Sequence, residues 1–236
     1  MKASAVAASE GSLGRAAAFD RGAAVTRSLL GYGVIAGPFY LLVGVLQGFL
    51  RDGFSFNRHP LSVLSNGSHG WVQTANFALT GAMVVAAAVG IARVLGKGKR
   101  ATSWALGIYG LSIFLASIFR ADPMDGFPAG TPLGPPTSMT TFGLMHFVVG
   151  GIGFTALAVA AFLAARAMSK RGDSTYARLS LAAGIIVVLG FHGAMAFQLF
   201  KSPVLGIWIA VVVGWAWLSA LSVQLYRVSP DPNCAT

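Results

Sequence analysis

Charged residues are scarce in this chain. Only 10% of its 236 residues are charged, as 17 basic and 7 acidic side chains, whereas 55% are hydrophobic. Soluble domains carry about 25% charged residues, so this chain lacks the polar surface that a soluble protein of its length needs. Its mean hydropathy of +0.70 is equally extreme. The composition excludes a soluble globular domain and indicates an integral membrane protein.

Cysteine is nearly missing as well, with Cys234 the only one. A single thiol forms neither an internal disulfide nor a Cys-pair metal site, which excludes a thiol-exchange enzyme. No Asp or Glu lies at the centre of a long apolar run, which argues against a proton-coupled pump. The sequence also has neither a Walker loop nor a dinucleotide-binding fingerprint, so it predicts no nucleotide-dependent chemistry.

Basic residues, by contrast, give the chain a formal net charge of +10. They occur in short clusters between apolar runs, as in residues 97–100. Nucleic-acid-binding proteins instead gather such residues in a patch or stripe. We therefore expect no nucleic-acid partner, and we interpret the clusters as signals for membrane topology.

Six apolar runs are long enough to cross a hydrocarbon core of about 30 Å. They predict an all-α, polytopic membrane protein with a six-helix transmembrane domain over residues 27–227. Residues 1–26 and 228–236 are predicted to be flexible cytoplasmic tails. The six predicted membrane helices cover residues 28–50, 71–95, 101–119, 141–168, 178–200 and 204–226.

The basic residues also predict the orientation of the bundle. With the N-terminus inside, 13 of the 17 basic residues fall in cytoplasmic segments. The four on the outer side are Arg51, Arg58, Arg120 and Lys201. Because basic residues concentrate in cytoplasmic loops, we expect both termini in the cytoplasm and the chain in the plasma (inner) membrane.

Small residues recur at four-residue spacing within the apolar runs, for example at Gly33, Gly37, Gly44 and Gly48. Such residues let helix backbones approach closely. The pattern can mark a dimer face or a compact bundle within one chain, and we favour the bundle. The oligomeric state stays open.

The two outer loops, residues 51–70 and 120–140, mix charge with Pro, Gly and apolar residues. We therefore expect them to fold back on the bundle rather than extend into solvent. In the first loop Leu61 and Leu64 share a helical face, as do Ser62 and Ser65, which predicts one short helical turn.

Histidines and amides form the polar content of the outer side. His146 lies about 8 Å and His192 about 12 Å inside consecutive antiparallel helices, counted from their outer ends, so the two imidazoles could meet. Gln73, Asn76 and Thr80 form a polar stripe in the second helix. These groups are costly in hydrocarbon and should face the bundle interior.

These residues predict an outward-facing polar pocket, formed by the outer loops, that binds a lipid headgroup or small ligand. Arg58 and Arg120 would meet an anionic group, and Trp71 would anchor the membrane interface. Membrane lipids are then the expected partners, and the sequence leans away from an enzyme. The candidate ligand-binding residues are Arg58, His59, Ser62, Ser65, Trp71, Gln73, Asn76, Arg120, Asp122, Asp125 and His146.

Three alternatives remain open at this stage. A metal-assisted hydrolase acting on lipid or envelope substrates would use Asp122, His146 and His192 to ligate zinc and activate water. No tight ligand spacing such as HExxH supports it, so no cofactor is assigned. A small-solute transporter is another alternative, and the same polar groups could also be purely interhelical hydrogen-bonding partners.

Several short motifs lie along the outer side of the chain. They are His59-Pro-Leu-Ser-x-Leu-Ser65, Gly70-Trp-Val-Gln73, Asn76-Phe77, Phe119-Arg-Ala-Asp-Pro123, Gly126-Phe-Pro128 and His146-Phe147. As a set they resemble the bacterial domain-of-unknown-function family nine-nine-eight, whose proteins are multi-helix membrane proteins distantly grouped with Frag1-like proteins. The resemblance implies a six-helix bundle without an established activity, and its Frag1-like relatives favour a lipid-related role. His192 is not among the motif positions.

Overall fold

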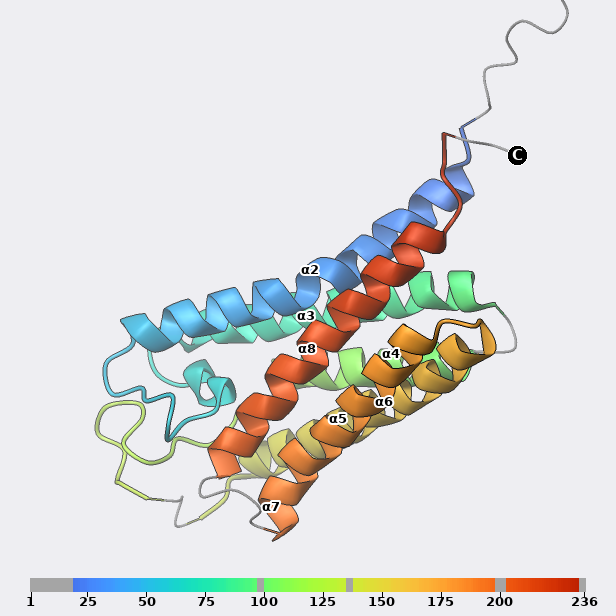
Figure 1. Ribbon diagram of the computed structural model, residues 1–236. Helices are drawn as coiled ribbons and strands as arrows, with labels where there is room; N and C mark the ends of the chain where they lie inside the picture. The colour runs from blue at the N-terminus through green and yellow to red at the C-terminus, as the bar shows by residue number, and fades with distance from the viewer. Residues whose placement is uncertain (1–18, 97–99, 135–137, 198–202, 234–236) are drawn as a thin grey trace, which may run out of the picture.

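The chain folds into a bundle of long helices (Figure 1). The computed structural model describes residues 19–96, 100–134, 138–197 and 203–233, and within them no β-strand occurs. This confirms the predicted all-helical class. The elements are α2 (Arg21–Leu50), the 3₁₀ helix η1 (Leu61–Ser65), α3 (Gly70–Leu95), α4 (Arg100–Ala116), α5 (Thr141–Lys170), α6 (Ser174–Val187), the π-helical segment η3 (Val188–Gly193), α7 (Ala194–Phe197) and α8 (Pro203–Val228).

Five helical segments within the described residues are long and apolar enough to cross a membrane. They are α2, α3, α5, the continuous segment Ser174–Gly193 and α8. The sixth predicted run corresponds to α4, whose 17 residues extend about 26 Å. These helices make the chain a multi-pass membrane protein.

The first helix begins earlier than the sequence predicts, at Arg21 rather than at residue 28. The Asp20 carboxylate caps it by accepting hydrogen bonds from the backbone N–H groups of Gly22, at 2.7 Å, and Ala23, at 3.0 Å. Residues 21–26 are therefore helical and not part of a flexible tail. Hydropathy missed this turn because a polar cap, and not an apolar run, starts the helix.

Other predicted boundaries also differ from the structure. The third membrane helix ends at Ala116 rather than at 119, and the fourth ends at Lys170 rather than at 168. The fifth begins at Ser174 rather than at 178, and the last one extends to Val228 rather than to 226. Residues 198–200 of the fifth predicted helix lie outside the described residues, as do residues 1–18 and 234–236 of the predicted tails.

The helices pack in a ring in which each contacts the next. The order around the ring is α2, α3, α4, α5, α6, α8 and back to α2. One end carries η1 and the two long loops 51–69 and 117–140, which we call the capped end. The other, which we call the terminal end, carries the start of α2, the end of α8 and the short turn between α5 and α6 (Figure 1).

Small residues make the contacts around this ring close. A Cβ atom added at Gly37 of α2 would lie 2.7 Å from Trp215 Cβ of α8. One added at Gly44 would lie 2.6 Å from the Leu61 side chain of η1. These glycines pack within the chain, as the bundle interpretation predicts.

The two halves of the ring are filled differently. Large side chains without solvent exposure close the half nearer the terminal end, among them Leu30, Ile91, Leu106 and Leu221. Each comes from a different helix of the ring. The half nearer the capped end contains a cavity instead.

Candidate functional site

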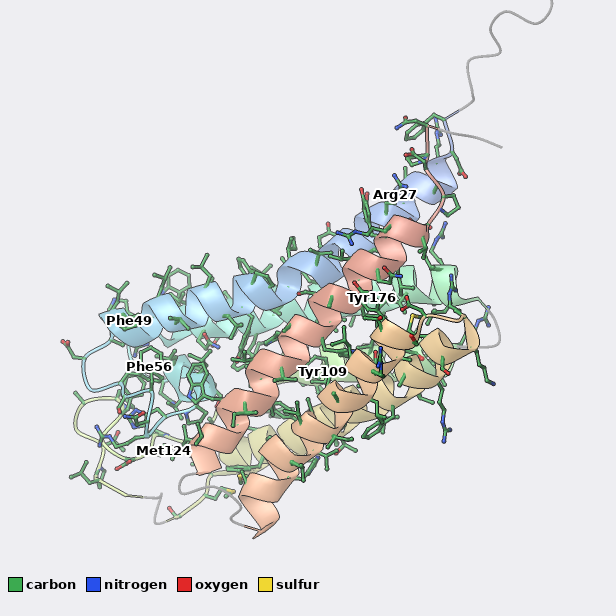
Figure 2. The ribbon with its side chains drawn as sticks, in the orientation of Figure 1. Arg27, Phe49, Phe56, Tyr109, Met124 and Tyr176 are labelled. Atoms are coloured by element: carbon green, nitrogen blue, oxygen red, sulfur yellow. The ribbon has the colours of Figure 1, made fainter. Side chains whose placement is uncertain are left out.

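The ring encloses a cavity of about 460 Å³ below the capped end. This volume is in the range of sites that hold a small organic ligand. Its walls are mainly apolar and aromatic, and Tyr109 of this wall is labelled in Figure 2. Every membrane segment contributes at least one side chain, including Tyr40 from α2, Phe77 from α3, Tyr109 from α4, Phe154 from α5, Phe191 from η3 and Trp208 from α8.

The 3₁₀ helix η1 forms the roof of this cavity. Residues 60–63 line it, and Leu61 and Val63 are themselves 4% and 1% exposed. Gly44 of α2 leaves the space into which Leu61 packs. The first loop therefore folds back on the bundle, and the predicted helical turn is confirmed.

His59 ties the first long loop to the second. Its side chain is fully buried, and Nδ1 accepts a hydrogen bond from the Ser55 backbone N–H at 2.9 Å. Its Nε2 lies 3.0 Å from the Asp125 carbonyl oxygen, which can only accept. Nε2 therefore carries the proton of a neutral imidazole, and both ring nitrogens hold backbone groups. His59 is thus a structural link and not a ligand group.

Arg58 and Asp125 reinforce the same junction. Arg58 Nη1 lies 3.6 Å from Asp125 Oδ1 and donates to the Asp125 carbonyl oxygen at 3.1 Å. Asp125 has a positive φ of 45°, and its Oδ1 also accepts from the Gly134 backbone N–H at 2.9 Å. The Arg58 guanidinium therefore neutralises a loop carboxylate, and neither residue lines the cavity.

An aromatic cluster beneath this junction was not identified from the sequence. Phe127 is 1% exposed and packs edge-on against Phe54, with the His59 ring centroid 5.7 Å away. The Arg51 guanidinium lies 5.0 Å from the Phe127 ring centroid, and burial lowers the pKa of this arginine. In the sequence, the Gly126-Phe-Pro128 motif was the feature that could have pointed to this buried phenylalanine. Figure 2 shows Phe56 and Met124 at this capped end.

Asp122 fastens the start of α5 to the second loop. Its Oδ1 accepts a hydrogen bond from Thr140 Oγ1 at 2.5 Å, and its Oδ2 accepts one from the Thr140 backbone N–H at 2.9 Å. Thr140 in turn caps α5 by accepting from the Gly143 N–H. A Cβ at Gly143 would collide with the Asp122 carboxylate. Asp122 lines the cavity, but both of its oxygens already have partners.

His146 lines the cavity and has an unused hydrogen-bond acceptor, while within the described residues the Trp208 Nε1 donor of the same wall is also without a partner. His146 Nδ1 lies 2.8 Å from the Phe119 carbonyl oxygen, so Nδ1 carries the proton. In the neutral ring Nε2 is then an acceptor, and no described residue donates to it. The ring lines the cavity and packs against Phe77 with their centroids 6.3 Å apart. It can therefore accept a hydrogen bond from a bound molecule.

His192 does not join His146, so the prediction of similar depth is wrong. His192 Nε2 lies 3.2 Å from Thr155 Oγ1, nine residues and about 13.5 Å along α5 from His146. The short turn 171–173 sets how α5 and α6 align along their length. His192 lies as many residues after this turn as Ile152 lies before it, so His192 is level with Ile152. Counting from the outer ends could not reveal this register.

The described residues contain no group of three or more His, Cys, Asp or Glu side chains placed to hold a metal ion. Asp122 is engaged by Thr140, and His192 is bound to Thr155 far from His146. The side chains named for the metal-assisted hydrolase are therefore not assembled into one site.

The polar stripe of α3 faces the bundle interior, as predicted. Gln73 Oε1 accepts from Gln47 Nε2 at 2.9 Å and from Asn76 Nδ2 at 3.2 Å. Asn76 Nδ2 also donates to the Tyr40 carbonyl oxygen of α2 at 3.1 Å, and Thr80 Oγ1 donates to Asn76 Oδ1. These groups join α2 to α3, and they lie outside the cavity wall.

The remaining candidate ligand residues lie in different places. Ser62 lines the cavity, whereas Ser65 is buried and donates to the Ser62 carbonyl oxygen at 2.7 Å. Trp71 is 69% exposed at the start of α3, where a membrane-interface residue is expected. Arg120 is exposed. Of the eleven candidates, the cavity wall contains Ser62, Asp122 and His146.

Comparison with known proteins gives one match. A protein-family model described as "Protein of unknown function (DUF998)" matches residues 34–224, which run from within α2 to within α8. No match was found among curated proteins or among solved structures. The matched region contains the capped end, all residues that line the cavity, and most of the ring.

Proposed function

The chain belongs to the DUF998 family of proteins of unknown function, and from this premise we propose that its cavity binds a neutral lipid that carries a hydroxyl group. The observation that supports this is the unused Nε2 of His146 in a mainly apolar cavity of about 460 Å³. The apolar walls would hold the hydrocarbon part, and His146 would accept the hydroxyl proton. The protein then acts by binding and presenting a lipid.

The charges around the cavity favour a neutral ligand over an anionic headgroup. Asp122 contributes a carboxylate to the wall, which would repel an anion. Arg58, the cation expected to meet an anionic group, pairs with Asp125 instead. Of the lipid headgroups that the sequence allows, we therefore propose an uncharged one with a hydroxyl group.

The bilayer offers the ligand a direct route into the cavity. Phe147 of α5 and Met195 of α7 both line the cavity, and they are 50% and 42% exposed. A wall residue that is also exposed lies where the cavity approaches the outer surface of the bundle. We place the entrance for a lipid between α5 and α7.

The filled half of the ring opposes passage of a solute across the bundle. Leu30, Ile91 and Leu221 have no exposure in the half nearer the terminal end. The described structure therefore supports a binding site more than a transport path.

Ligand binding depends on Nε2 of His146 in this proposal. His146→Asn keeps a side-chain N–H that can donate to the Phe119 carbonyl oxygen and removes the Nε2 acceptor. We expect dioleoylglycerol to bind about tenfold more weakly, equivalent to about 1.4 kcal/mol. The measurement is saturable quenching by brominated dioleoylglycerol of Trp208 and Trp215, which line the cavity. The background carries Trp71→Phe and Trp104→Phe, because both indoles are exposed.

Two neighbouring glycines supply a matched test of the same cavity. Gly150 lines it and Gly151 does not, and a Cβ at either position meets nothing within 4 Å. Gly150→Phe should abolish the quenching, and Gly151→Phe should leave it unchanged. Equal quenching in His146→Asn, Gly150→Phe and the unmodified chain would exclude this cavity as the lipid site.

The proposal also places the capped end outside the cytoplasm, because basic residues concentrate toward the terminal end. In a Cys234→Ser background, we expect a membrane-impermeant maleimide to label Ser68→Cys in intact cells. Arg100→Cys, exposed at the other end, should react only after the cells are opened. The reverse labelling pattern would turn the cavity toward the cytoplasm.

A further inference from the structure

We propose that a groove between α5 and α6 at the terminal end binds the headgroup of an anionic phospholipid. The groove has a volume of about 760 Å³. Three cations, Arg166 and Lys170 of α5 and Arg178 of α6, line it together with the Ser169 side chain. Arg166 and Lys170 are one helical turn apart and so lie on the same face of α5. This site is separate from the cavity and does not depend on the function proposed for it.

The three cations are available to a ligand because no carboxylate neutralises them. The two ion pairs among the described residues are Arg27–Asp231 and Arg58–Asp125. Asp173, the acidic residue in the α5–α6 turn, binds other groups. Its Oδ1 accepts a hydrogen bond from the Tyr176 backbone N–H, and its Oδ2 accepts one from Gln224 Nε2 at 2.7 Å. Arg166, Lys170 and Arg178 are all exposed.

The depth and the walls of the groove distinguish a phospholipid from a free phosphate ion. Arg166 and Arg178 each lie four residues, or about 6 Å, from the helix ends that flank the turn. Beyond them the lining becomes apolar, with Val159, Phe162 and Leu181. Cations at the headgroup level above an apolar wall match an anionic headgroup with acyl chains below it.

Native mass spectrometry of the full chain in detergent tests this site. The unmodified protein should retain dioleoylphosphatidylglycerol in preference to dioleoylphosphatidylcholine. Arg166→Gln/Lys170→Gln/Arg178→Gln should reduce the bound phosphatidylglycerol on the order of tenfold. The matched control, Arg21→Gln/Arg100→Gln/Arg227→Gln, removes three exposed cations at the same end outside the groove and should keep the preference.

A second variant separates lost binding from lost folding. Ala165→Trp narrows the groove without changing its charge, and it should also reduce phosphatidylglycerol binding while helical circular dichroism stays native. The proposal would be overturned if the groove variants still preferred phosphatidylglycerol over phosphatidylcholine. It would also be overturned if the control variant lost this preference to the same extent. Displacement of the phospholipid by excess inorganic phosphate would instead reassign the groove to a phosphate ion.

Discussion

Replacement of His59 by leucine is expected to lower the free energy of unfolding by about 3 kcal/mol. The imidazole is fully buried and holds the Ser55 N–H and the Asp125 carbonyl oxygen at the same time. Leucine leaves the Ser55 N–H unpaired, which costs about 1–3 kcal/mol. It also removes one of the two hydrogen bonds to the Asp125 carbonyl oxygen, which keeps the one from Arg58 Nη1. Unfolding in mixed detergent and dodecyl sulfate micelles, followed by circular dichroism, measures the loss.

His69 supplies the control for this prediction. It lies in the same loop, is exposed, and its Nδ1 contacts only the adjacent Ser68 hydroxyl. His69→Leu should change the free energy of unfolding by less than about 0.5 kcal/mol. If the two variants lose equal stability, the His59 bridge between the loops does not stabilise the capped end.

The His59 bridge also explains why the sequence placed some groups correctly and misjudged their roles. Scarce polar groups in an apolar chain must be satisfied internally, which correctly predicted that Gln73 and Asn76 face the interior. The same scarcity suggested a polar pocket around His59, Arg58 and Asp125. Residue type shows that a buried imidazole needs partners, but it does not show whether they are backbone groups or a ligand.

The cavity itself could not be read from the sequence. It depends on which faces of the six segments point inward and on how the segments align along the membrane normal. The π-helical segment η3 illustrates the difficulty, because its wider turn changes the direction of the side chains that follow. Phe191 of this segment stacks on Phe154 with centroids 4.1 Å apart, and both line the cavity. An apolar run with α-helical spacing does not predict a π turn.

The sequence predicted that helices pack closely, but not which helices are neighbours. The four-residue spacing of Gly33 and Gly37 correctly indicated close contact, and Trp215 of α8 fills the space beside Gly37. Spacing alone does not identify the neighbouring helix. Gly81 of α3 and Gly110 of α4 also bring two helix backbones into close contact, yet neither glycine has another small residue four positions away.

Gly81→Val is the second substitution with a large expected effect, a loss of about 3 kcal/mol in the free energy of unfolding. A Cβ at Gly81 would lie 2.6 Å from the Phe114 backbone nitrogen and 2.7 Å from the Gly110 carbonyl oxygen. Both are backbone atoms of α4, so no rotamer change relieves the overlap and the two helices must separate. Overpacking of this kind typically costs 1–3 kcal/mol, and separating α3 from α4 also loosens one side of the ring.

Gly107 of α4 controls for the change in helix propensity and side-chain size. A Cβ there meets nothing within 4 Å, so Gly107→Val should alter the free energy of unfolding by less than about 1 kcal/mol. Unfolding in mixed micelles again measures both variants. Gly81→Val should also weaken dioleoylglycerol quenching, because Phe77 and Tyr109 of the same two helices line the cavity. Equal stability of the two variants would mean that α3 and α4 do not pack at Gly81 as described.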